Sequence, residues 1–129
     1  MKEITSTQNK LVKELVQLRE KSKLRRKKAM FLVEGLREIS LAKKGSYKIN
    51  QLYFVPGVIS AEKLDEILNL SDVEKIVVSD DVYYKLALRY STAGVIALVE
   101  ARINWLQELK FKNKNPSKII AESTEQKST

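Results

Sequence analysis

The sequence contains no cysteine and no histidine among its 129 residues. Without cysteine there is no disulfide framework, which suits a reducing cytoplasm. The absence of both residue types excludes the common zinc sites and the Ser-His-Asp and Cys-His nucleophile systems. A carboxylate magnesium site or a catalytic carboxylate pair stays open, but no tight acidic cluster favours either. Asp80 and Asp81 stand where a helix should begin, so we favour a helix-capping role for them.

Long hydrophobic runs are also missing. No run approaches the roughly 20 residues that a membrane-spanning helix needs. The longest, residues 95–99, has the length of a buried strand. The N-terminus is charged and lacks the apolar segment of a secretory signal. We therefore expect no membrane partner, no export and a cytoplasmic location. The hydrophobic fraction of 43% and charged fraction of 31% predict one compact domain with a short tail.

Positive charge is unevenly distributed along the chain. The net charge is +8. Residues 1–28 hold ten Lys or Arg against three Asp or Glu, a balance of +7, whereas residues 29–129 hold fourteen against thirteen, a balance of +1. Within the first quarter, residues 19–28 read R-E-K-S-K-L-R-R-K-K. A nearly neutral domain that carries one basic segment indicates a polyanionic partner.

Hydrophobic periodicity predicts four helices that alternate with four strands. For the first helix, Thr5 and Gln8 fit a capping box, with Ser6 as an alternative cap. The basic segment that follows is either a helical extension or a loop, and the mutual repulsion of its charges favours a loop that its polyanionic partner orders. The predicted strands are 30–33, 49–55, 75–78 and 94–100, and the later helices carry apolar stripes within 36–45, 60–68 and 79–89.

This alternation predicts an α/β domain whose central sheet is largely parallel and covered by helices on both faces. After residue 100 the pattern changes. Residues 101–111 fit an amphipathic helix with Ile103, Leu106 and Leu109 or Trp105 on one face, and residues 112–118 read as a polar linker. Residues 119–121 are apolar enough to open another strand.

Residues 4–35 carry a family resemblance. They read I-T-S-T-Q-N-K-L-V-K-E-L, then the basic segment, then F-L-V-E-G. This pattern resembles the N-terminal substrate-binding domain of SpoU-type RNA methyltransferases. Asn9 takes the place of the family's Asn, Arg25 that of its Arg, and Phe31 lies in the strand that ends at Glu34 and Gly35.

A second motif supports the resemblance. Residues 91–97, S-T-A-G-V-I-A, resemble the family's Thr-Pro-Gln-Gly-Val-Val-Ala signature, so the likeness extends over roughly residues 3–100. Leu24 stands where the family often has an aromatic residue, Ala29 where Gly is common, and Thr92-Ala93 replaces the Pro-Gln pair. These departures affect the expected conformation of the loops and not the family resemblance.

The resemblance implies a three-layer α/β/α domain with a mixed or largely parallel four-stranded sheet, similar to ribosomal proteins that bind kinked RNA. In the family, this domain precedes a knotted catalytic domain that binds S-adenosylmethionine and forms a homodimer. No catalytic signature appears here, so we expect residues 1–100 to be the RNA substrate-binding domain and 101–129 to lead toward an absent catalytic domain. The chain alone is then inactive and binds no cofactor, and its partner is rRNA or, alternatively, tRNA.

Ten residues are expected to contact RNA. Cations neutralise phosphates, and an arginine grips one through two parallel hydrogen bonds. Glu34 is expected to orient Arg25. Neither Arg25 nor Arg26 lies on an apolar stripe, so both should be replaceable without unfolding. The expected contacts are Asn9, Lys10, Lys21, Lys23, Arg25, Arg26, Lys27, Lys28, Glu34 and Gly35.

Plainer roles remain open at several of these positions. Asn9 equally fits a helix cap, and Gly35 fits ordinary turn chemistry. Tyr83, Tyr84 and Tyr90 fit base stacking, although their helical spacing favours the core. Two other functions also stay open. One is a stand-alone RNA-binding protein, and the other is a structural or oligomerisation module whose basic segment docks on an acidic protein.

Overall fold

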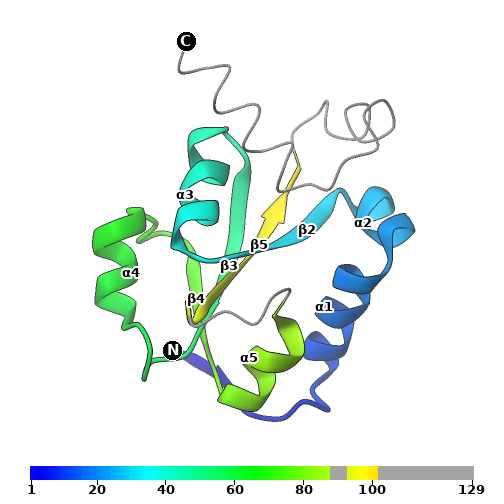
Figure 1. Ribbon diagram of the computed structural model, residues 1–129, viewed down its shortest axis with the longest axis horizontal. Coiled ribbons are helices and arrows are strands. Elements are labelled where there is room, and N and C mark those ends of the chain that lie inside the picture. The colour runs from blue at the N-terminus through cyan, green and yellow to red at the C-terminus, as the bar shows by residue number, and fades with distance from the viewer. Residues whose placement is uncertain (88–92, 102–129) are drawn as a thin grey trace.

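The computed structural model describes residues 1–87 and 93–101. Within them, strands and helices alternate from α2 onward (Figure 1). The elements are β1 (Lys2–Ile4), α1 (Lys10–Glu20), α2 (Ser22–Lys28), β2 (Met30–Glu34), α3 (Leu36–Lys44), β3 (Lys48–Phe54), α4 (Ala61–Leu68), β4 (Glu74–Val78), α5 (Asp80–Leu86) and β5 (Val95–Glu100).

The sheet has the strand order β1-β4-β3-β5-β2. β1, β4 and β3 are parallel to one another, and β5 runs antiparallel to both of its neighbours, β3 and β2. This confirms the predicted mixed and largely parallel α/β sheet. The fifth strand, β1, was not predicted. It has three residues, of which only Ile4 is buried, so it shows no apolar run or alternation that a sequence pattern would reveal.

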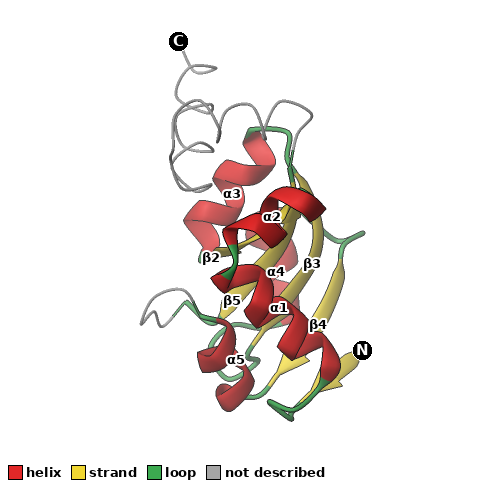
Figure 2. Cartoon of the chain, turned by 90° about the vertical axis from the view of Figure 1, so that its right-hand side faces the viewer, coloured by secondary structure: helices red, strands yellow, loops and turns green. Residues whose placement is uncertain are grey.

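Helices cover both faces of the sheet and create two apolar clusters. In Figure 1, α3 and α4 lie on one side of the sheet and α1, α2 and α5 on the other, which is the side that faces the viewer in Figure 2. Among the described residues no polar or charged residue is fully buried. The α3–α4 side of the sheet buries Phe31, Val33, Leu52, Phe54, Val95, Ala97 and Val99, and the opposite side buries Leu32, Tyr53, Ile76, Val78, Ile96 and Leu98.

The first helix begins at Lys10, and its N-cap is Asn9. The Asn9 Oδ1 atom accepts a hydrogen bond from the Leu11 amide at 2.8 Å, which satisfies one of the free amides of the first turn. The predicted Thr5–Gln8 capping box is therefore wrong. Ser6 does accept a bond from the Gln8 amide at 3.1 Å, but it does so within the turn that joins β1 to α1.

The basic segment is helical, so the favoured loop is wrong and the alternative of a helix is confirmed. Two features offset the repulsion among its charges. Leu24 packs against the apolar cluster beneath α1. Four cations also occupy the last turn of α2, where the helix dipole favours positive charge. Ala29 ends α2 in a left-handed conformation with φ of 54°, a backbone geometry that glycine adopts more easily than alanine.

Some predictions lie outside the described residues. These are the amphipathic helix and linker of 101–118 beyond Ala101, and the strand at 119–121. The helix predicted to end near Arg89 ends at Leu86, since its C-cap Ala87 is extended. Within the described ranges, no helix is both long and apolar enough to cross a membrane.

Replacing Phe31 with Ala should destabilise the domain by about 3–5 kcal/mol, since large aromatic truncations in a core cost that much. Phe31 is 1% exposed and meets the Tyr47 ring edge-on, with 5.9 Å between ring centroids. Urea denaturation followed by circular dichroism measures the loss. An unchanged unfolding midpoint would show that Phe31 is not a core residue.

Candidate nucleic-acid interface

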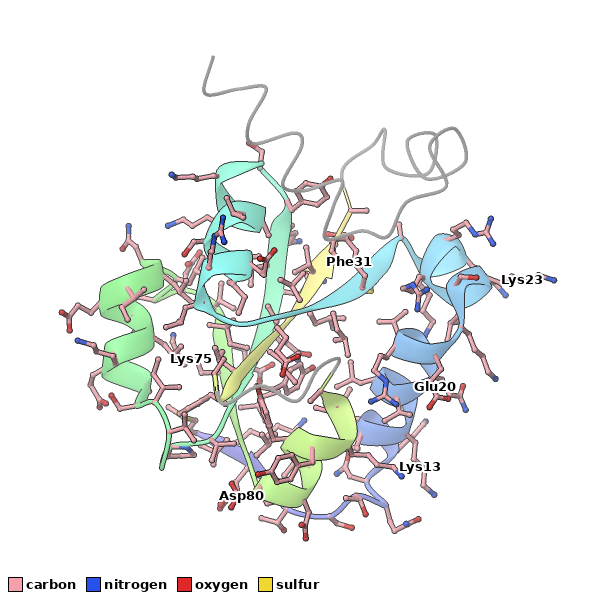
Figure 3. The ribbon with its side chains drawn as sticks, in the orientation of Figure 1. Lys13, Glu20, Lys23, Phe31, Lys75 and Asp80 are labelled. Atoms are coloured by element: carbon pink, nitrogen blue, oxygen red, sulfur yellow. The ribbon has the colours of Figure 1, made fainter. Side chains whose placement is uncertain are left out.

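Helix α2 divides its side chains between the protein and the solvent. Leu24 and Arg25 are partly buried against the body, whereas the other cations of the helix and its N-cap are exposed. Figure 3 shows Lys23 extending away from the fold. The exposed cations are Lys21, Lys23, Arg26, Lys27 and Lys28. We call these five residues the α2 cation face. All five were predicted as contacts, and the fold brings them together on one short helix.

Arg25 has a structural task. Its Nη1 atom donates to the backbone carbonyl of Leu18 at 3.0 Å and to that of Arg19, which are among the free carbonyls at the end of α1. Burial, and then repulsion from Arg26, lowers the pKa of Arg25. The guanidinium nevertheless remains charged at neutral pH, because the usual pKa of an arginine side chain lies far above neutral pH. Arg25 therefore fixes the angle at which α2 leaves α1.

Arg19, in α1, caps the carboxyl end of α5 in the same way. Its Nη1 atom donates to the backbone carbonyls of Lys85 at 2.6 Å and Ala87 at 3.1 Å, at the carboxyl end of α5. Its Nη2 atom forms an ion pair with Glu20 at 3.0 Å. Two arginines of the basic segment thus connect α2 to α1 and α1 to α5. Charge counting along the sequence cannot separate these two residues from the exposed ones.

Asn9 and Lys10 lie at the other end of α1. Eleven residues at about 1.5 Å each place them roughly 16 Å from the start of α2. Lys10 is exposed and lies 4.0 Å from Glu14, a weak surface pair that leaves its ammonium available to a phosphate. The Asn9 side-chain oxygen is used by the cap. These two positions therefore do not adjoin the α2 cation face.

Glu34 and Gly35 lie at the far end of β2 from α2, about 13 Å along the strand at roughly 3.3 Å per residue. Arg25 holds the end of α1, and Glu34 Oε2 accepts a hydrogen bond from the Tyr83 hydroxyl at 2.8 Å. The expectation that Glu34 orients Arg25 is therefore wrong. Gly35 has φ of +96° and its amide donates to the Val95 carbonyl, which is turn chemistry that glycine permits.

Tyr83 is a residue that sequence reasoning placed only as core or as a base-stacking candidate. It is 4% exposed, and its hydroxyl both donates to Glu34 and accepts from the Gly94 amide at 3.2 Å. It thus joins the two motifs that carried the resemblance, Glu-Gly and S-T-A-G-V. Gly94 itself has φ of +74°, and a Cβ there would lie 2.6 Å from the Val58 side chain. Helical spacing gave no signal for this hydroxyl contact.

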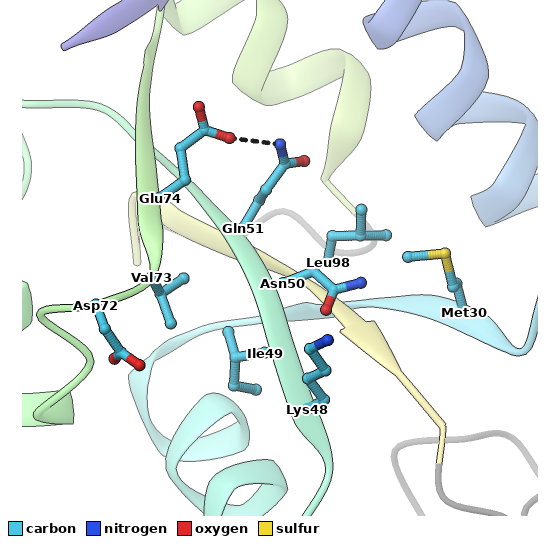
Figure 4. A pocket seen from close by; sticks show the side chains of 9 residues that line it. All are labelled: Met30, Lys48, Ile49, Asn50, Gln51, Asp72, Val73, Glu74 and Leu98. Atoms are coloured by element: carbon cyan, nitrogen blue, oxygen red, sulfur yellow. Dashed lines mark hydrogen bonds between the residues drawn. The ribbon is translucent and has the colours of Figure 1, made fainter.

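The described residues hold no group of three acidic side chains that would bind a metal ion. The pocket beside β3 does not fit S-adenosylmethionine, the cofactor implied by the resemblance. A nucleoside cofactor needs an enclosed, mostly apolar slot. The pocket of about 590 Å³ beside β3 is open to solvent and carries charged side chains at its rim (Figure 4).

Comparison with known proteins identifies relatives of this fold. A family profile described as "MRM3-like substrate binding domain" matches residues 9–97. No curated protein matches the chain. A solved structure of an RNA 2′-O ribose methyltransferase is similar, with 33% identity and a TM-score of 0.68 over 78% of this chain and 38% of that one.

Two further solved structures are similar. One is an rRNA methyltransferase from Sinorhizobium meliloti, with 27% identity and a TM-score of 0.61 over 78% of this chain and 37% of that one. The other is the SpoU methyltransferase AviRb from Streptomyces viridochromogenes in complex with AdoMet, with 23% identity and a TM-score of 0.65 over 79% and 39%. It supports the fold alone. The chain spans less than two fifths of the length of these structures. Together with the family profile, they confirm the resemblance drawn from the motifs.

Replacing Arg25 with Ala should destabilise the domain by about 1–2 kcal/mol, since a charged donor to the end of α1 is lost. The sequence led us to expect that Arg25 is replaceable without unfolding, and its bonds to the end of α1 add a stability cost that the sequence did not indicate. Arg26→Ala, one position along and exposed, is the matched control and should change stability by no more than about 0.5 kcal/mol. Equal effects in a urea titration would contradict the capping role.

Replacing Tyr83 with Phe should destabilise the domain by about 1–3 kcal/mol, because the Gly94 amide loses its buried acceptor. Tyr84→Phe, on the same helix but 59% exposed, serves as the control and should have a smaller effect. Hydrogen exchange of the Gly94 amide adds a local measurement. If its protection is the same in Tyr83→Phe as in the wild type, the hydroxyl does not hold this amide.

Proposed function

Because the chain belongs to the MRM3-like substrate-binding domain family, we propose that it holds RNA for a ribose 2′-O-methyltransferase and binds it first through the α2 cation face. The observation that carries this proposal is the fixed orientation of α2. Arg25 and Leu24 attach the helix to the body, and five cations remain exposed on it.

Binding at this face is electrostatic. Each Lys or Arg that neutralises a phosphate releases condensed counterions, so affinity falls steeply as salt rises. Because α2 is held by the fold, its backbone needs no ordering when RNA binds, which reduces the entropic cost of association. Arg26 adds geometry, since its guanidinium is exposed and able to form two parallel hydrogen bonds with one phosphate.

The remaining predicted contacts extend the proposed surface. Lys10 adds a cation at the far end of α1. Glu34 and Gly35 lie at the carboxyl end of β2, the edge of an α/β sheet at which ligands usually bind. The hydrogen bonds of Tyr83 hold the end of β2 and the start of β5 in place. We propose that this end of the sheet contacts RNA through complementary shape and that α2 contributes most of the affinity.

We propose ribosomal RNA as the substrate class, with transfer RNA as the alternative. The similarity to an rRNA methyltransferase from Sinorhizobium meliloti supports this choice. We propose that a catalytic domain of this enzyme class carries out methyl transfer. The same domain would bind S-adenosylmethionine and form the dimer. Calorimetry of this chain with S-adenosylmethionine should then show no binding, and a clear isotherm would contradict that division of labour.

Replacing Lys23, Arg26 and Lys27 with Ala should weaken RNA binding and flatten its salt dependence. Each lost phosphate contact lowers the slope of log K against log salt by about 0.7 to 0.9, so three contacts lower it by roughly 2 to 3. Fluorescence anisotropy with a labelled rRNA fragment at several salt concentrations measures both quantities.

The matched control replaces three exposed cations elsewhere, Lys44, Lys63 and Lys85, and so removes the same charge. It should retain most of the wild-type slope. Equal losses in both triple variants would mean that net charge, and not the α2 cation face, attracts the RNA. If the wild-type chain forms no complex with ribosomal or transfer RNA in dilute buffer, the proposed function is wrong.

A further inference from the structure

The pocket beside β3 adjoins the α2 cation face. Its volume of about 590 Å³ lies within the range of roughly 300–1,000 Å³ that is usual for ligand sites. Met30, the first residue of β2, lines it, and Ala29 alone separates Met30 from Lys28, the last residue of α2. Two steps along the chain place the Cα atoms of Lys28 and Met30 at most about 8 Å apart. A molecule that binds the cations of α2 therefore also reaches the pocket.

A β-bulge shapes the wall of the pocket that β3 supplies. Ile49 pairs with Val99 and Gln51 pairs with Leu98, so Asn50 is an extra residue with no counterpart in β5. Bulges of this kind interrupt the ladder and change the direction of a side chain. Asn50 lines the pocket, and its side chain makes no hydrogen bond within residues 1–87 and 93–101. Its amide is therefore available to a ligand.

The floor of the pocket is apolar and partly accessible. Met30 and Val73 are only partly buried, so they retain surface that a flat aromatic group is able to cover. The thioether of methionine also makes favourable contacts with aromatic rings. Such an open pocket is a weak site for a free small molecule. A base of an RNA chain is different, because phosphates held by α2 present it to the pocket at a high effective concentration.

A fixed pair of polar groups stands above this floor. Figure 4 shows Gln51 of β3 joined to Glu74 of β4, where Gln51 Nε2 donates to Glu74 Oε1 at 2.7 Å. The Tyr53 hydroxyl donates to Gln51 Oε1. Burial, and then the charge of Glu74, raises the pKa of Tyr53, so this hydroxyl keeps its proton. The two bonds together fix which side of the Gln51 amide faces the carboxylate.

This pair retains hydrogen-bonding capacity. An amide nitrogen carries two hydrogens, and the second one on Gln51 has no partner in the part of the chain that the structure describes. Glu74 is exposed, and its carboxylate has room for further donors. The pocket therefore offers an N–H donor directly beside a charged acceptor.

The hydrogen-bonding edge of guanine complements this arrangement. An unpaired guanine presents two adjacent donors, the N1–H and the 2-amino group, next to the O6 acceptor, whereas the other three bases present one donor group on the same edge. Two parallel donors suit a carboxylate particularly well. The exposed carboxylates of Asp72 and Glu74 also repel phosphates. The sugar-phosphate chain then stays at α2 while the base points into the pocket.

We propose that this pocket binds an unpaired guanine of the RNA that the α2 cation face holds. Glu74 accepts from the N1–H and the 2-amino group, Gln51 donates to O6, and the ring lies against Met30. The proposal rests on the proposed function, since the α2 cation face supplies the phosphate contacts. It adds a preference for one base to a surface that otherwise attracts any RNA.

Fluorescence anisotropy with short labelled RNAs tests the base preference. The full chain should bind a uridine heptamer with one central guanosine about five- to tenfold more tightly than the uridine heptamer, the lower range for a two-bond base contact because the pocket is open. Inosine at the centre, which lacks only the 2-amino group of guanosine, should lose most of this preference. Adenosine at the centre stacks well but lacks the paired donors, so it should bind like uridine.

Glu74→Gln should remove the preference for guanosine, because the carboxylate that accepts both donors is lost. Glu66→Gln is the matched control, since Glu66 is also exposed but lies on α4 outside the pocket lining. Each variant loses one negative charge, so the ratio of affinities for the guanosine and uridine heptamers is the quantity to compare. The control should keep the wild-type ratio.

The outcomes separate this proposal from the proposed function. Equal wild-type affinity for the guanosine, adenosine and uridine heptamers overturns the guanine site, as does an equal loss of preference in Glu74→Gln and Glu66→Gln. Tighter but equal binding of guanosine and adenosine indicates stacking alone and also overturns it. If no heptamer binds, the guanine site is wrong, and only the further absence of a complex with ribosomal or transfer RNA overturns the proposed function.

Discussion

The hydrogen bonds from Arg25 to the end of α1 determine how this protein presents its charge. An α-helix ends in carbonyl groups that have no partner within the helix and that carry partial negative charge. Arg25 satisfies two of them at the end of α1, and Arg19 does the same at the end of α5. The same segment therefore contains cations that build the fold and cations that remain free to meet a polyanion.

The opposite end of the domain is organised by a neutral hydroxyl. Tyr83 joins the end of β2 to the start of β5 through Glu34 and Gly94, two segments sixty residues apart in the sequence. The bond from the Gly94 amide is costly to break because it is buried, where an unsatisfied amide has no replacement partner. The two motifs that carry the family resemblance thus meet through a residue that belongs to neither. The α2 cation face and this edge lie at opposite ends of β2.

Much of the architecture was predictable from hydrophobic patterns. The strands β2, β3, β4 and β5 were found within one residue of their bounds because each contains a run of apolar residues, which in β2 and β5 is buried on both faces of the sheet. β1 was missed because its partner, β4, is more than seventy residues away and it buries only Ile4. The loop predicted for α2 was wrong because repulsion among its charges was weighed without the anchoring of Leu24 or the dipole of the helix end.

The sequence by itself determined the α/β class, the location of the basic segment and the family, because these depend on local periodicity, charge and motif spacing. Only the tertiary structure decided which cations are exposed, that Arg25 and Glu34 do not meet, and that an acid-rimmed pocket adjoins the end of α2. The reason is physical. Each of these outcomes depends on carbonyl groups, hydroxyls and strand neighbours that are far apart along the chain and become partners only when the sheet has formed.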